Sequence, residues 1–160
     1  MSVLKSRRRE SAGEYVNLAN NIYEHVLWFL IRLSNRYQRL LASDVMKLAS
    51  EVLDYSEKAN NITVGSDQLS YDLRKTFLIN AKVSVMALDV HMSHIWNIIQ
   101  ENPQGCFTDT KGNTVSPQRA DEILNKMADK LGNEIDEFKN KVTALLRSDN
   151  ERFKKAIKSK

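Results

Sequence analysis

Apolar side chains recur every three or four residues along four long stretches of this 160-residue chain, and this spacing constrains the fold most. It matches one face of an α-helix, and only five glycines and two prolines interrupt the chain. Turn-rich β folds use more of both residues. We therefore predict an all-α protein, with enough residues for one domain around one buried core.

The first two helices are bounded by short polar breaks. One is expected at about 10–33, where Ser34-Asn35 interrupts the apolar stripe. The second is expected to end near Asn61, and Ser43-Asp44 suits the cap of its main body. Residues 37–42 are either part of this helix or a separate short turn.

The last two helices have clearer starts. Ser66-Asp67 predicts the beginning of a helix that runs to about Glu101, and Ser116-Pro117 places a capping serine before a proline at the first helical position. Between them, residues 106–115 suit a small hairpin around the turn 109–113. Short connections between the first three helices predict an antiparallel, up-down four-helix bundle with this insertion before its last helix.

The third helix has two apolar faces. Its expected core stripe is matched on the opposite side by a second stripe, which a four-helix bundle leaves facing outward. Exposed apolar patches often mark interfaces, so we predict that this stripe joins copies of the chain in a homo-oligomer. The alternative is that the fourth helix or the hairpin covers it. The expected core residues are Leu73, Phe77, Ala81, Leu88, Met92, Ile95 and Ile99, and the interface residues are Ile79, Val83, Met86 and Val90.

Basic residues gather at both ends of the chain. This charge pattern divides it into a basic arm at 1–9, a bundle at 10–147 and a basic tail at 148–160. Lysine and arginine in such arms bind nucleic-acid phosphates by displacing counterions, although they also simply keep proteins in solution. The residues expected to contact phosphates are Arg7, Arg8 and Arg9 in the arm, and Lys154 and Lys155 in the tail.

No pattern of catalytic or metal-binding residues is present. Cys106 is the single cysteine, and His91 and His94 have no third ligand specified near them. The chain also lacks a phosphate-binding glycine loop. We therefore expect no enzyme activity, metal or cofactor. No apolar run of about 18 residues and no signal-peptide pattern occurs, which predicts a cytoplasmic protein that does not enter membranes.

Several positions in the first three helices are shared with a known protein family. An aromatic residue follows an isoleucine at Ile22-Tyr23, and an Arg-Tyr pair at Arg36-Tyr37 follows the break. Small residues at Ala49 and Ala59 precede Asn60. In these features, residues 15–100 resemble small bacterial four-helix-bundle proteins encoded in ribosomal RNA intervening sequences, and the related accessory proteins of diversity-generating retroelements.

The resemblance implies a non-enzymatic, pentameric protein with a basic surface that binds RNA or DNA together with a reverse transcriptase. The basic turn of that family corresponds here to Arg32, Arg36 and Arg39, or else these are solvated side chains that pair with nearby carboxylates. Trp28 points away from the expected core, where it either stacks on a base or is covered by a neighbouring subunit. A helical scaffold without a nucleic-acid role is the alternative function.

Overall fold

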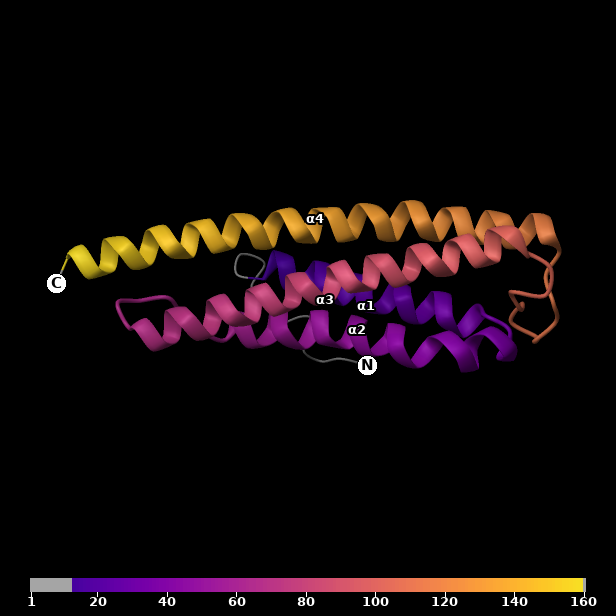
Figure 1. Ribbon diagram of the computed structural model, residues 1–160, viewed down its shortest axis with the longest axis horizontal. Helices are drawn as coiled ribbons and strands as arrows, with labels where there is room; N and C mark the ends of the chain where they lie inside the picture. Colours follow the sequence, from indigo (N-terminus) through magenta and orange to yellow (C-terminus); the bar gives the residue numbers. More distant parts are fainter. Residues whose placement is uncertain (1–12, 160) are drawn as a thin grey trace.

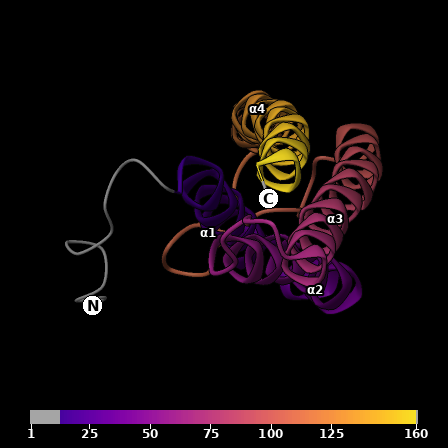
Figure 2. The same cartoon turned by 90° about the vertical axis from the view of Figure 1, so that its left-hand side faces the viewer.

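The computed structural model describes residues 13–159, which form four helices and confirm the all-α, up-down bundle (Figure 1). Viewed down the long axis of the bundle, α4 packs between α1 and α3, and α2 packs between them on the side opposite α4 (Figure 2). The arm residues Arg7, Arg8 and Arg9 lie outside the described residues. The helices are α1 (Glu14–Arg32), α2 (Asn35–Asn60), α3 (Gln68–Glu101) and α4 (Pro117–Lys158).

The helix starts at α3 and α4 are capped as the sequence predicts. The Asp67 carboxylate accepts a hydrogen bond from the Ser70 N–H at 2.8 Å, and the Ser116 hydroxyl accepts one from the Arg119 N–H at 3.3 Å. At α2 the prediction is wrong, because Ser43 lies inside a helix that already begins at Asn35. Residues 37–42 therefore belong to α2.

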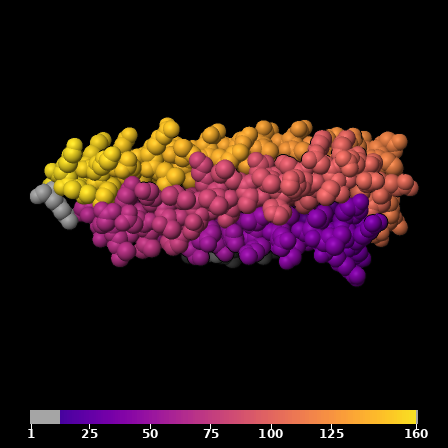
Figure 3. Space-filling model, viewed as in Figure 1, coloured from indigo at the N-terminus to yellow at the C-terminus, as the bar shows by residue number. Residues whose placement is uncertain are grey.

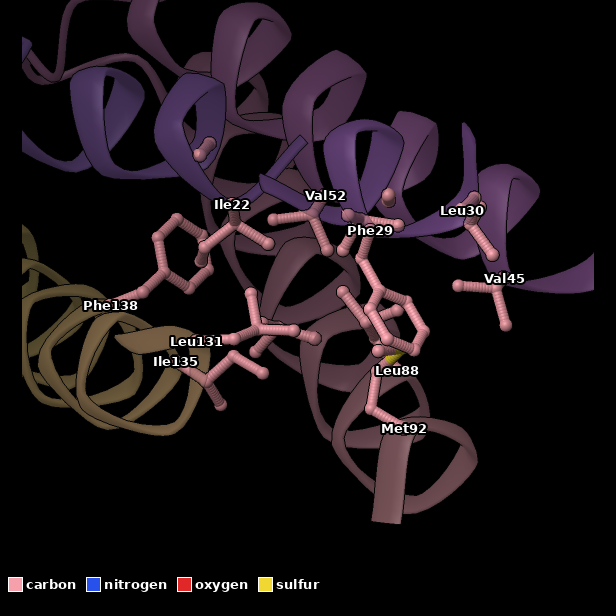
Figure 4. Close-up of a cluster of buried hydrophobic side chains, with 14 of the residues drawn as sticks. Ile22, Phe29, Leu30, Val45, Val52, Leu88, Met92, Leu131, Ile135 and Phe138 are labelled. Carbon is pink, nitrogen blue, oxygen red and sulfur yellow. The ribbon is translucent and has the colours of Figure 1, made fainter. Parts of the chain in front are cut away.

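The core lies where the four helices converge, and all four contribute side chains to it (Figure 4). On α3 the prediction is partly wrong. Leu73 is 43% exposed and Phe77 is half-buried, whereas Leu78 and Val85 are fully buried. The physical reason is that the buried positions of α3 repeat every seven residues, as in a coiled-coil seam, and this repeat passes through Tyr71 rather than Leu73.

The segment 148–158 continues α4 without a break past the boundary predicted at 147. Asp149 and Phe153 are buried, and the Phe153 ring stacks on Tyr71 with centroids 4.3 Å apart. Lys154 and Lys155 are exposed on the other side of the same turns. The high density of basic residues hides this amphipathic pattern in the sequence.

A buried ion pair fixes this end of the bundle. Arg74 Nε donates to Asp149 at 2.6 Å, and Arg74 Nη1 donates to the carbonyl oxygens of Ala59 and Ile62 at 2.6 and 3.0 Å. The guanidinium thus binds one carbonyl in the last turn of α2 and one just beyond its end, and the Ala59 carbonyl also accepts the Ile62 N–H at 3.2 Å. One side chain of α3 thus ties α2 to α4.

The link between α3 and α4 contains a tight turn at 109–113, which the isolated bridge Thr108–Thr114 closes, close to the hairpin expected there. A second isolated bridge, Leu33–Phe107, joins the link to the residue after α1. Within the turn, the Asp109 carboxylate accepts hydrogen bonds from the N–H groups of Asn113 and Lys111, which lower the pKa of that carboxyl. Outside the turn, the link holds the end of α1, because the Thr108 N–H donates to the Arg32 carbonyl at 2.8 Å.

Candidate nucleic-acid interface

A groove of about 350 Å³ runs between α1 and the first part of α4, and basic side chains predominate among its charged residues. Such a volume lies within the range of roughly 300 to 1,000 Å³ that ligand pockets span. The lining of the groove comes from α1 (His25, Trp28, Phe29 and Arg32) and from α4 (Arg119, Glu122, Ile123, Lys126, Met127 and Lys130).

Helical spacing places the basic side chains in the groove. Arg119, Lys126 and Lys130 are separated by seven and four residues, so they lie along one stripe of α4. Trp28 and Arg32 are four residues apart on the facing edge of α1. The row on α4 is about 16 Å long, given the helical rise of about 1.5 Å per residue.

The apolar part of the groove is firmly supported. Phe29 is buried, and its ring meets Phe107 edge to face with centroids 5.6 Å apart. The link that contributes Phe107 also bonds the last turn of α1, as described above. Trp28 stands beside this support and is 64% exposed, as the sequence predicts for a side chain pointing away from the core.

The groove carries an excess of positive charge. Four basic residues line it, and Glu122 is the single acidic residue in the lining. Glu122 pairs with Arg119 at 2.6 Å, but both side chains are well exposed, so the pair adds little stability and opens readily. Arg32, Lys126 and Lys130 form no ion pair with any residue in the described range 13–159, which leaves these charges free to meet an anion.

At the inner end of the groove, His25 is held by a carboxylate. Its Nδ1 lies 2.7 Å from Glu134 Oε2, and both side chains are largely buried. This contact ties α1 to α4 next to the groove.

The three arginines of the predicted basic turn do not share one surface. Leu33 and Ser34 have extended backbones, so the chain reverses between Arg32 and Arg36 and no single helix carries all three side chains. Arg32 lines the groove, whereas Arg36 lines a separate hollow beside the end of α3. Arg39 is exposed on α2.

The predicted contacts in the C-terminal segment are also remote from the groove. Lys154 lies 24 residues beyond Lys130 on the same helix, which is about 36 Å. The residues that the sequence reasoning missed are Arg119, Lys126 and Lys130. Their shared stripe is readable from the sequence, but its apposition to Trp28 depends on which helices are neighbours.

The outward face of α3 is the second candidate surface. Ile79, Val83, Met86 and Val90 are each between 41% and 58% exposed, so neither α4 nor the link covers the predicted interface stripe. Figure 3 shows α3 along the middle of one face of the molecule, between α4 and α2. The alternative in which the chain's own helix covers this stripe is therefore wrong.

Charge is nearly absent from this face. Between Thr76 and Ile98, the charged residues are Lys82 and Asp89, and both turn toward α4. Lys82 donates to the Thr143 hydroxyl at 2.9 Å, and Asp89 lies 3.6 Å from Lys139. The remaining exposed surface of this stretch is apolar or uncharged over about 33 Å of helix.

Other kinds of site find no support in the described residues. Within 13–159, no three histidine, cysteine, aspartate or glutamate side chains gather where they could hold a metal ion. Cys106 is buried, and its thiol donates to the Asn102 carbonyl at 2.7 Å, which is a structural role. No helix in this range combines the length and apolar character that a membrane crossing needs.

Comparison of the chain with family models, curated proteins and solved structures finds no significant match.

Proposed function

We propose that this protein is a non-enzymatic, oligomeric nucleic-acid-binding protein of the cytoplasm, which binds RNA or DNA through the groove between α1 and α4. The observation that carries the proposal is the set of four basic side chains around this groove, three of which have no ion-pair partner among the described residues. Lysine and arginine in such rows gain affinity by releasing counterions from phosphates.

Copies of the chain associate through the outward face of α3. Its exposed apolar side chains extend along about 33 Å of helix, and such patches mark surfaces where proteins associate. Leu40 of α2 is 75% exposed and extends this patch past Ile98, since both line the same hollow. Because α3 and the groove lie on different sides of the bundle, copies that pair through α3 leave their grooves open.

Assembly also explains how a protein with a formal charge of only +4 binds a polyanion. Several grooves held in one particle engage one strand together, so that overall affinity exceeds that of a single groove. The resemblance to retroelement accessory proteins implies a pentamer that works with a mobile-element reverse transcriptase, and both remain part of the proposal.

The test is a comparison of two charge-matched variants by fluorescence anisotropy with labelled RNA and DNA. Lys126→Gln with Lys130→Gln removes two charges inside the groove, and Lys154→Gln with Lys155→Gln removes two at the far end of α4. We expect the first variant to bind at least tenfold more weakly and the second to bind nearly as the unaltered protein does. Equal losses in both variants would contradict binding in the groove.

A further inference from the structure

We infer that the groove selects single-stranded nucleic acid, because Trp28 offers a stacking surface that only an unpaired base can reach. This inference rests on the proposed function and names its substrate class. The observations behind it are the 64% exposure of Trp28, its place at the edge of the groove and the apolar groove wall next to it. A basic track beside an exposed aromatic ring is the arrangement with which proteins hold single strands.

The phosphates and the bases of a bound strand would meet different helices of the groove. The basic row of α4 follows the long direction of the groove for about 16 Å, which corresponds to four or five phosphates at the roughly 3.4 Å spacing of a stacked strand. Trp28 stands across the groove on α1, with Arg32 one turn away. A strand lying along α4 therefore turns its bases toward the indole ring.

Apolar side chains complete the base site. Ile123 and Met127 line the groove on α4, and Phe29 lines it on α1. A planar base that enters between Trp28 and these side chains removes apolar surface from water on both of its faces. A duplex presents no free base face, and extruding one from the stack costs a few kilocalories per mole, so duplexes gain only the phosphate contacts.

Single strands of RNA and of DNA both offer the phosphates and the base faces that this groove fits. Stacking and phosphate contacts do not depend on the 2′-hydroxyl, so RNA and DNA strands of equal sequence should bind with similar affinity. Sequence preference should be weak as well, because every base has a face that stacks. An acidic peptide would satisfy the lysines and arginines of the groove but would leave Trp28 without a planar partner.

The test uses the full-length protein with Trp96→Phe, so that Trp28 is the single tryptophan and its emission reports on the groove. Four probes are compared: a 12-nucleotide RNA strand, the DNA strand of the same sequence, the corresponding DNA duplex and a DNA strand of equal length with abasic sugars. We expect both base-bearing strands to quench Trp28 fluorescence. The duplex and the abasic strand should quench it little and bind more weakly.

A second test measures the affinity of the Trp28→Ala variant for the same probes by fluorescence anisotropy. This variant keeps Trp96, and circular dichroism checks its helical content. Affinity for base-bearing strands should fall between about 5-fold and about 150-fold, the range set by known base–aromatic stacking. Affinity for the abasic strand and the duplex should change less than twofold, and Trp28→Phe should restore part of the loss. These differences distinguish stacking from a general disturbance of the groove.

Three outcomes would overturn the inference. One is an equal loss for base-bearing and abasic strands in Trp28→Ala, and another is duplex binding as tight as strand binding. The third is competition by a poly-glutamate peptide of equal charge that is as strong as competition by the unlabelled strand. In each case the groove remains a polyanion site, whereas failure of every nucleic-acid probe to bind would contradict the proposed function itself.

Discussion

The buried ion pair at the end of α4 yields the sharpest prediction about stability. Asp149 lies 2.6 Å from Arg74, and their side chains are only 5% and 11% exposed. Removing one partner of such a pair leaves the other charge buried and costs about 3 to 5 kcal/mol. Because Arg74 keeps its bonds to two carbonyl oxygens, we expect Asp149→Ala to cost about 3 kcal/mol, a large part of a typical total of about 5 to 15 kcal/mol.

Urea unfolding followed by circular dichroism measures this loss. Asp149→Asn retains an oxygen acceptor for Arg74, so its cost should be smaller, about 1 to 2 kcal/mol. The control is Asp136→Asn, which weakens a surface pair with Lys139 and should change stability by less than about 0.5 kcal/mol. A loss below about 1 kcal/mol for Asp149→Ala would refute the packing of this end of α4, and would favour a detached basic tail.

Three further predictions concern the core, the α3 face and α4. Burial raises the pKa of Tyr15 to about 12, so the folded protein keeps a proton that the unfolded chain loses near pH 10. Stability should therefore be full below about pH 10 and fall by about 1.4 kcal/mol per pH unit toward pH 12. Tyr15→Phe should remove this loss in urea unfolding. Val83→Glu with Met86→Glu should turn the oligomer into a folded monomer by light scattering, and an unaltered protein that is already monomeric at tens of micromolar contradicts this. Gly132→Ala should raise stability by about 0.5 to 1 kcal/mol, since a Cβ there meets no atom within 4 Å, and a lower melting temperature would contradict it.

The sequence predicts the helices well because their signals are local. Apolar spacing and the caps at Asp67 and Ser116 depend on residues within one or two turns of the chain. The start of α2 depends instead on the reversal at Ser34, whose N–H donates to the Cys106 carbonyl at 2.7 Å. This partner is 72 residues away in the chain, so no local pattern reveals it.

The candidate site was predictable only in part, for the same reason. The exposed stripe at Val83 and the outward position of Trp28 follow from helical geometry alone. The groove needs a further fact, namely that α4 lies beside α1 and brings Lys126 opposite Trp28. Basic residues cluster at the two ends of the chain, and this clustering predicted phosphate contacts there. The basic row of the groove forms no such cluster, because it is spread over 12 residues of one helix, 119–130.

The central claim is that the groove binds the phosphates of a nucleic-acid strand, and the salt dependence of binding tests it most directly. Each phosphate neutralised on a single strand contributes about 0.7 to the slope of log affinity against log salt. For a strand short enough to occupy one groove, the four groove residues therefore predict a slope of about −3. Removing two charges with Lys126→Gln and Lys130→Gln should reduce the steepness by about 1.4. A slope that these changes leave unaltered, or no binding at low salt and tens of micromolar protein, would contradict the claim.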